Sequence, residues 1–216
     1  MDYSVIVIGA GHAGVEAAVL ASKVCGNVAL VTLNVENLGM MSCNPSIGGI
    51  GKGVIVREVD ALSGVMGEAI DKSSIHSKIL NESKGEAVRG PRAQADRVLY
   101  KKAISEIIKN TKGLDLVIGS VEELLIENAE VKGVKLADGR VLKSKAIVLT
   151  TGTFLSGLIL LGEKRIKAGR IDEAPSYGLS GSLKSCGFEM GRLKTGTPAR
   201  LLKSSINWDI LEKQEG

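Results

Sequence analysis

The chain is poor in aromatic residues, cysteine and proline. Of its 216 residues, 3% are aromatic, 3 are cysteine and 4 are proline. So few aromatic rings exclude a row of side chains on which nucleic-acid bases could stack. The cysteines, Cys25, Cys43 and Cys186, are odd in number and widely spaced, which excludes a disulfide framework and a metal-binding pair such as CxxC. This cysteine usage fits a reducing cytosol, and no metal site is expected.

Long apolar runs and a strong charge imbalance are also missing. The N-terminus, MDYSVIVIGAGHAG, has no basic region, and its apolar run is too short for a signal peptide or a membrane span. Basic residues outnumber acidic ones by 28 to 24, and this excess permits contact with nucleic acid without arguing for it. We therefore expect a cytoplasmic protein with no membrane partner.

The first 33 residues predict one βαβ unit. Residues 4–8 (SVIVI) form a short β-branched run typical of a strand buried in a parallel sheet. Residues 15–24 (VEAAVLASKV) show helical spacing of apolar residues, and Cys25-Gly26 is expected to end the helix. Residues 28–33 (VALVTL) give the second strand, so the unit has the expected length of about 30 residues.

Glycine is abundant, and its first cluster stands between that strand and that helix in the order G-x-G-x-x-G. Gly9 permits a tight turn, Gly11 lets a pyrophosphate approach the backbone, and Gly14 allows the helix to pack closely on the sheet. This context makes a chance glycine-rich turn the weaker interpretation. His12 is interpreted as a first-turn residue beside the pyrophosphate. The residues predicted to bind the dinucleotide here are Gly9, Ala10, Gly11, His12, Ala13 and Gly14.

The acidic residue that usually follows the second strand and binds the ribose is absent. Thr32-Leu33-Asn34 occupies its place. Asn34 could make one of the ribose hydrogen bonds, and Glu36 lies slightly further on; the sequence does not decide between them. The departure argues against an ordinary NAD dehydrogenase.

A second glycine cluster, SCNPSIGGIGKG at residues 42–53, is not a P-loop. Lys52 is followed by Gly53 instead of Ser or Thr, and no buried strand is expected before it. Cys43 is either a small buried apolar residue or a thiolate whose pKa is lowered by backbone amides and Lys52. The glycine-rich setting favours the thiolate, while the lack of a nearby second cysteine disfavours a redox pair.

The remaining pattern predicts an α/β fold with a β-meander. Residues 35–92 read as a long glycine-rich segment with short helical pieces, which is typical of functional loops. Residues 93–109 predict an amphipathic helix with Val98, Leu99, Ala103, Ile104, Ile107 and Ile108 on its apolar side. Further strands are expected at 114–120, 123–127, 130–136 and 140–152, with a hairpin turn at Asp138-Gly139, a buried parallel strand within 146–152, and a last helix near 178–185.

Basic residues crowd the stretch SKGEAVRGPRAQADR. They are Lys84, Arg89, Arg92 and Arg97, and Lys101 and Lys102 continue the series. A solvated charged surface is the usual explanation of such a run. The glycine and proline among the arginines instead indicate an ordered basic loop suited to phosphate groups.

Several of these strings together resemble one known family. GAGHAGVEAA, SCNPSIGGIGKG, RGPRAQADRVLY, VLTTGTFL and GRLKTGTPAR are similar to the MnmG (GidA) family of tRNA-modifying flavoproteins, over about residues 4 to 208. The resemblance implies a Rossmann-like FAD-binding domain of the two-dinucleotide-binding flavoprotein type. It covers residues 1–200 as the first segment of that domain, and residues 201–216 as the start of a following region.

The resemblance also implies an activity and its participants. Family members use FAD, NADH and methylene-tetrahydrofolate, work with a GTPase of the MnmE family, form homodimers, and add an aminomethyl or carboxymethylaminomethyl group to C5 of the tRNA wobble uridine. By position, Val121 and Ser176 match residues that touch FAD, and Cys43 matches a cysteine of the chemistry. Lys52 and the basic residues Lys84, Arg89, Arg92 and Arg97 would face tRNA phosphates or the folate.

The chain is much shorter than family members, so the expected FAD domain is incomplete at its C-terminus and leaves an exposed sheet edge. Two alternatives remain open. One is an inert truncated remnant with at most weak flavin or tRNA binding. The other is a folate- and FAD-dependent tRNA uracil methyltransferase, which typically carries an acidic residue where this chain has Thr32-Leu33-Asn34. A small-molecule nicotinamide oxidoreductase explains neither Cys43 nor the basic stretch.

Overall fold

A computed structural model describes residues 2–42, 44–196 and 199–216. Its centre is a parallel sheet with the strand order β11-β2-β3-β7. The strands are β2 (Val5–Ile8), β3 (Val28–Thr32), β7 (Leu114–Ile118) and β11 (Ile147–Leu149). β2 is β-branched throughout and buried except at Val5, and every residue of β3 is buried, as expected for a sheet covered on both faces.

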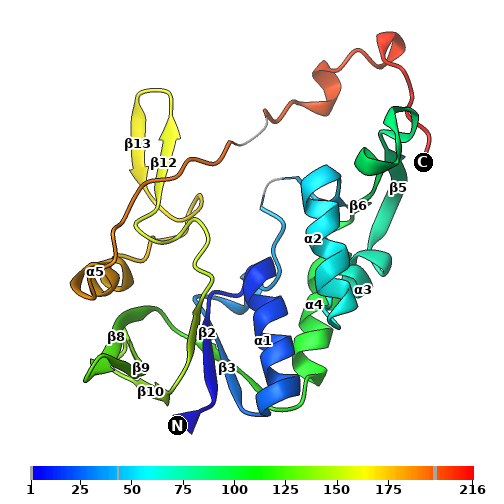
Figure 1. Cartoon of the computed structure of the whole chain (residues 1–216). Coiled ribbons are helices and arrows are strands. Elements are labelled where there is room, and N and C mark those ends of the chain that lie inside the picture. Colours follow the sequence, from blue (N-terminus) through cyan, green and yellow to red (C-terminus); the bar gives the residue numbers. More distant parts are fainter. Residues whose placement is uncertain (1, 43, 197–198) are drawn as a thin grey trace.

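Two helices cover one face of this sheet, α1 (His12–Cys25) and α4 (Arg97–Asn110) (Figure 1). Alternation along the strands decides which layer each residue meets. Val7 and Leu30 pack with the helices, while Ile6 and Ile8 pack with the layer on the opposite face. The parallel sheet is therefore the middle of three layers.

The opposite face is covered by an antiparallel meander with the order β1-β10-β9-β8. Its strands are β1 (Asp2–Tyr3), β8 (Val121–Glu127), β9 (Glu130–Leu136) and β10 (Val141–Ser144), and α5 (Gly178–Ser185) packs against β8. β9 and β10 are joined through Asp138-Gly139, where Gly139 has φ +89°. This confirms the hairpin predicted there.

A long excursion leaves β3 and returns at β7 through α4. It contains η1 (Val35–Asn37), β4 (Ser46–Gly48), α2 (Ile50–Ala61), α3 (Met66–Asp71), β5 (Ser74–Leu80), η2 (Glu82–Lys84), η3 (Glu86–Val88) and β6 (Gly90–Ala95). Glu16 of α1 attaches this excursion to the core at the start of α3. Its carboxylate accepts hydrogen bonds from the backbone N–H groups of Val65 at 2.9 Å and Met66 at 2.6 Å. Such a cap satisfies donors that a helix cannot satisfy itself.

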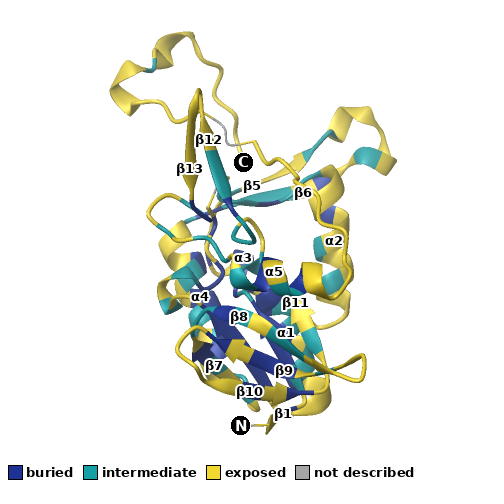
Figure 2. Cartoon of the chain, turned by 90° about the vertical axis from the view of Figure 1, so that its left-hand side faces the viewer, coloured by how far each residue is buried: buried dark blue, intermediate teal, exposed yellow. Residues whose placement is uncertain are grey.

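The last part of the chain is the most exposed (Figure 2). β12 (Leu158–Leu161) and β13 (Lys164–Lys167) form a projecting hairpin. After α5 the chain passes through η4 (Lys203–Ser205) and η5 (Trp208–Ile210) to the far end of β5, where Lys78 Nζ donates to the carbonyl of Glu215 at 3.1 Å. Among the described residues, no helix is both long and apolar enough to cross a bilayer.

Three expectations about the elements are wrong. Residues 93–95 belong to strand β6, not to the following helix, and β4-β6-β5 is an antiparallel sheet that the sequence did not predict. On α4, Val98 and Leu99 are exposed, and the buried side is carried by Tyr100, Ala103, Ile104 and Ile108. β11 is parallel to β2 as predicted, but Val148 and Leu149 are exposed because β11 is the edge of the described sheet.

Candidate dinucleotide-binding cleft

A cleft of about 110 Å³ lies at the carboxyl ends of the parallel strands. Its walls come from the turn after β2, from the end of β3, and from the loops Gly119–Val121 and Thr150–Phe154. Ligands of open α/β sheets bind at this end of the strands. A larger open hollow of about 1630 Å³ lies beside the meander and α5, but the glycine motif does not line it, so the smaller cleft is the candidate site.

The three motif glycines differ in the space around them. Gly9 has φ +101°, and a Cβ there would lie 2.4 Å from the carbonyl oxygen of Thr150. At Gly14 a Cβ would lie 1.7 Å from the carbonyl oxygen of Gly9, so helix and turn touch. A Cβ at Gly11 would meet nothing within 4 Å, which leaves the backbone there open to a ligand.

Helix α1 offers its N-terminus to the cleft. Gly11 is the N-cap residue and supplies no side-chain cap, and the first turn holds no acidic residue. Backbone N–H groups of a first helical turn lack partners within the helix and carry a partial positive charge. Gly9, Ala10 and Gly11 line the cleft, while Ala13 is exposed on the helix surface and Gly14 is buried against the turn. The arrangement suits an anionic group such as a diphosphate.

Ser176 lines the cleft from the segment just before α5. Its side-chain Oγ is buried and has no hydrogen-bond partner, while its backbone N–H donates to the carbonyl of Phe154 at 2.8 Å. Buried hydroxyl groups are normally paired. Val121, 4% exposed, lines the same cleft from the start of β8. Both predicted positions therefore face the space that the glycine turn opens, and the residues present fit a dinucleotide.

Thr150, which the sequence analysis did not identify as a site residue, links the end of β11 to the end of β2 at the cleft. Its Oγ1 lies 2.9 Å from the carbonyl oxygens of both Ile8 and Gly9, and its backbone N–H donates to Ile8 at 2.9 Å. A hydroxyl has one hydrogen to donate, so the two carbonyls share it. The available signal was the Thr-Thr-Gly that follows the predicted strand in 146–152.

Asn34 does not line the cleft. Its side-chain Oδ1 accepts the backbone N–H of Glu36 at 2.9 Å and caps the short turn η1. Glu36, the other candidate, pairs with Lys101 of α4. Thr32, Leu33 and Asn37 are the residues of this stretch that line the cleft.

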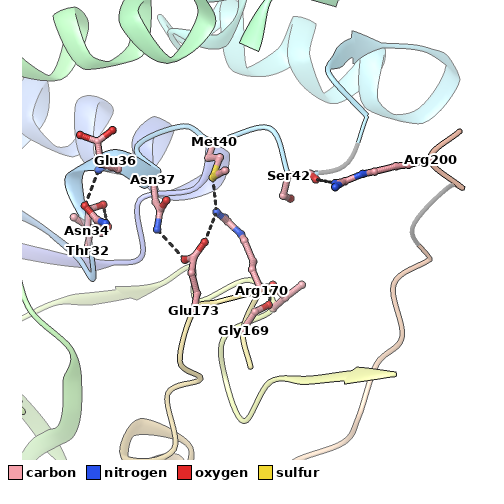
Figure 3. A network of polar contacts seen from close by, with 11 residues as sticks. Thr32, Asn34, Glu36, Asn37, Met40, Ser42, Gly169, Arg170, Glu173 and Arg200 are labelled. Carbon is pink, nitrogen blue, oxygen red and sulfur yellow. Dashed lines mark hydrogen bonds and ion pairs between the residues drawn. The ribbon is translucent and has the colours of Figure 1, made fainter. Parts of the chain in front are cut away.

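Arg170, also missed from the sequence, stands on the opposite wall. Its guanidinium lies 5.1 Å from the ring centre of Phe154, 3.8 Å from a carboxylate oxygen of Glu173, and 3.0 Å from the sulfur of Met40 (Figure 3). Asn37 donates to the other oxygen of Glu173 at 2.8 Å. The network joins residues 130 and 136 positions apart, which no local pattern could reveal.

His12 is held as a neutral imidazole. Burial, and then the positive charges of Lys52 and Arg170, lower its pKa from 6.5 to about 4. Its ring meets the ring of Tyr100 edge to face, with centroids 5.7 Å apart. His12 is thus a packed residue of the first turn, although two cations and the start of α1 give its surroundings a positive potential.

The basic residues do not form one loop. Arg92 lies on β6 opposite Lys78, Arg89 donates from Nε to the carbonyl of Glu82 at 2.9 Å, and Arg97 begins α4. Lys84 is exposed at the end of η2. Lys52, in the first turn of α2, donates to the carbonyl of Ser46 at 3.0 Å and has its pKa lowered by burial. None of the five lines the cleft. Cys43 lies outside the described residues.

The parallel sheet, its glycine turn and its meander define a Rossmann-type domain of the FAD-binding flavoproteins. PqsL of Pseudomonas aeruginosa, described as a probable FAD-dependent monooxygenase, shares this fold at a TM-score of 0.50 and 17% identity, over 68% of this chain and 42% of that one. The sequence model of glucose inhibited division protein A, GidA, matches residues 4–216. The chain belongs to the GidA family.

Relatives in this family are highly similar to the chain. The tRNA uridine 5-carboxymethylaminomethyl modification enzyme MnmG of Granulibacter bethesdensis is 56% identical over 217 residues, which is 99% of this chain and 34% of that protein. The structure of Aquifex aeolicus GidA matches with a TM-score of 0.95 and 46% identity, over 100% of this chain and 36% of that one. The chain therefore spans about a third of the length of the relatives it matches.

Proposed function

We propose that this chain is the flavin-binding N-terminal part of an FAD-dependent protein that modifies the wobble uridine of tRNA. The observation that carries the proposal is the buried, unpartnered hydroxyl of Ser176, which faces a cleft that the open backbone of Gly11 also borders. The tRNA uridine modification carried out by its MnmG relatives supports the substrate class. The uncapped start of α1 supports an anionic cofactor.

Bound FAD would supply hydride transfer. The turn Gly9–Gly14 and the main-chain N–H groups of the first turn of α1 would hold its diphosphate, and the Ser176 hydroxyl would donate to an oxygen or nitrogen of the cofactor. Val121 and Phe154 form apolar walls that exclude water from the cleft. We assign Cys43 the role of nucleophile or acid/base toward C6 of the uracil ring.

The remaining participants in the reaction are proposed for a protein of the full length of the relatives, about a third of which this chain matches. They are tRNA, methylene-tetrahydrofolate as carbon donor, NADH as reductant of the flavin, a GTPase partner of the MnmE family, and a second copy of the chain. Lys52, Lys84, Arg89, Arg92 and Arg97 are assigned to tRNA phosphates or the folate, because arginine and lysine bind phosphate through charge-assisted hydrogen bonds.

Flavin retention tests the proposal directly. The purified chain should show flavin absorbance after incubation with FAD and desalting. Gly11→Leu should abolish it, because the new side chain enters the space that the diphosphate needs. Gly181→Leu on α5 is the matched control, since a Cβ there also meets nothing within 4 Å but lies away from the cleft. A colourless wild-type chain would support the inert remnant instead.

The uridine chemistry requires the whole protein. In a full-length relative, alanine at the position that matches Cys43 should leave flavin bound and remove the modified uridine from tRNA, as read by nucleoside mass spectrometry. Persistent modification would show that the thiol is dispensable. A 5-methyluridine product would favour the methyltransferase.

A further inference from the structure

The segment Asn37–Ser42, which begins at the last residue of η1, is tied to the loop Gly169–Glu173 beside the cleft. Asn37 Nδ2 donates to Glu173 Oε2 at 2.8 Å, and Arg170 Nη1 donates to Met40 Sδ at 3.0 Å (Figure 3). Asn37 and Arg170 both line the cleft, so these contacts join its two sides.

The loop that carries Arg170 is built independently of that segment. Thr153 Oγ1 donates to the carbonyl of Gly169 at 3.0 Å, and the backbone N–H groups of Gly169 and Glu173 donate within the loop at 3.0 and 3.1 Å. A Cβ at Gly169 would lie 2.2 Å from the ring of Phe154. This tight packing fixes the backbone of the loop and therefore the position from which the Arg170 side chain extends.

The segment itself has apolar anchors on its inner side. Leu38 and Met41 are 4% and 5% exposed and belong to the helix-side core. The backbone N–H of Gly39 donates to the carbonyl of Ala10 at 2.9 Å. Asn37 and Met40 point the other way, toward Glu173 and Arg170 (Figure 3). The polar contacts therefore add a restraint on the outer side, where the core gives none.

The charges of the pair are partly withdrawn from water. The Arg170 and Glu173 side chains are 22% and 24% exposed, and their nearest charged atoms are 3.8 Å apart. Glu173 thus neutralises Arg170 and at the same time accepts from Asn37. A contact with a charged partner in a half-buried setting is stronger than one between neutral groups in water.

We infer that Arg170 and Glu173 are positioning residues that hold Asn37–Ser42 beside the flavin cleft. Cys43 follows this segment in the sequence, so we expect its reactivity to report the restraint. This inference rests on the proposed function for the flavin and for the role of Cys43. Nothing in it requires Arg170 or Glu173 to touch the reacting atoms.

Cysteine labelling of the 216-residue chain tests the inference. Iodoacetamide rates are measured for each cysteine by peptide mass spectrometry, and the exposed Cys25 and Cys186 serve as references within each sample. Glu173→Ala should speed labelling of Cys43 about tenfold, as for the loss of one charge-assisted hydrogen bond, and leave both references unchanged. Glu173→Gln, which keeps an oxygen for Asn37, should give an intermediate rate.

The control variant is Glu163→Ala, in the exposed turn between β12 and β13, which should leave all three rates unchanged. Added FAD provides a second readout. It should slow labelling of Cys43 in the wild-type chain, and Glu173→Ala should lose this protection while still retaining flavin absorbance.

Equal Cys43 rates in the wild-type, Glu173→Ala and Arg170→Ala chains would overturn the inference. Faster labelling of all three cysteines together would also overturn it, because that result reports general loosening of the fold. A wild-type chain that retains no flavin contradicts the proposed function alone, since the labelling comparison without FAD still decides the role of the pair.

Discussion

Gly11 and Gly14 stand three residues apart at the start of α1, and a side chain at each would meet different surroundings. At Gly11 the space is open and the backbone has φ −72°, which any residue adopts. At Gly14 the helix touches the turn that precedes it. One glycine thus leaves room for a ligand, and the other leaves room for the protein itself.

Gly14→Ala should therefore destabilise the fold even without ligand. The added methyl group would overlap the carbonyl of Gly9, and overpacking of this kind costs about 1–3 kcal/mol or more. Gly11→Ala should change the free energy of unfolding by less than about 1 kcal/mol. Urea denaturation of both variants measures the difference. Similar losses in the two variants would contradict the assigned roles.

His12 should make stability depend on pH in a defined direction. Its pKa is lowered to about 4 from 6.5, so between these values the unfolded chain binds a proton that the folded chain does not. Stability should fall as the pH drops from about 6.5 to about 4, by up to about 3 kcal/mol, and this contribution ends below pH 4. His12→Gln should remove that component. NMR titration of the His12 ring measures the pKa, and a value near 6.5 would refute the assignment.

Residue patterns predicted the site only where they are local. The glycine turn between β2 and α1 follows from spacing within six residues. Asn34 does not line the cleft, and its Oδ1 is used by the turn at η1, a local hydrogen bond that the sequence did not reveal. Thr150 and Arg170 escaped notice because only closure of the sheet brings them beside the glycine turn.

At the scale of elements, Asp96 decides where α4 begins. Its carboxylate accepts from the backbone N–H groups of Val98 at 2.8 Å and Leu99 at 2.9 Å. Residues 93–95 pair with β4 and β5 instead of joining the helix. The predicted helix began too early because the spacing of apolar residues indicates which side of a helix is buried. The first residue of the helix is instead set by the capping residue.

Asp96→Ala should cost about 0.5–2 kcal/mol, because two first-turn donors lose their acceptor. Asp96→Asn should retain most of the stability, since the amide oxygen can accept the same bonds. Thermal or urea unfolding compares the two variants. If both were equally destabilised, the carboxylate charge would matter more than the cap.

The longer elements were predicted well and the short polar ones were not. The βαβ unit at residues 4–33, the meander with its turn at Asp138-Gly139, and helix α5 are confirmed. The sheet β4-β6-β5 was missed because its strands are short or mix apolar residues with Gly, Ser and Pro, so they carry no clear alternation. Hydrogen bonding between these strands, and not the sequence pattern of any one of them, defines the sheet.

At the scale of the whole molecule, β11 is an edge strand of the parallel sheet with exposed apolar side chains. It pairs with β2 on one side, and Val148 and Leu149 are 36% and 41% exposed. Unpaired strand edges with apolar side chains favour association between chains.

Val148→Lys should lower concentration-dependent association of the isolated chain, since a charge on an edge strand discourages pairing. Val24→Lys, at an apolar residue 76% exposed on α1, is the matched control and should have little effect. Light scattering across a concentration series measures both variants. Equal association of wild type and Val148→Lys would place the contact elsewhere.

Glu16 links distant parts of the molecule mechanically. It stands two residues beyond Gly14 on α1, and its carboxylate holds the start of α3, which in turn packs on α4 and β6. The helix that borders the cleft is thereby tied to the sheet on which Arg92 lies.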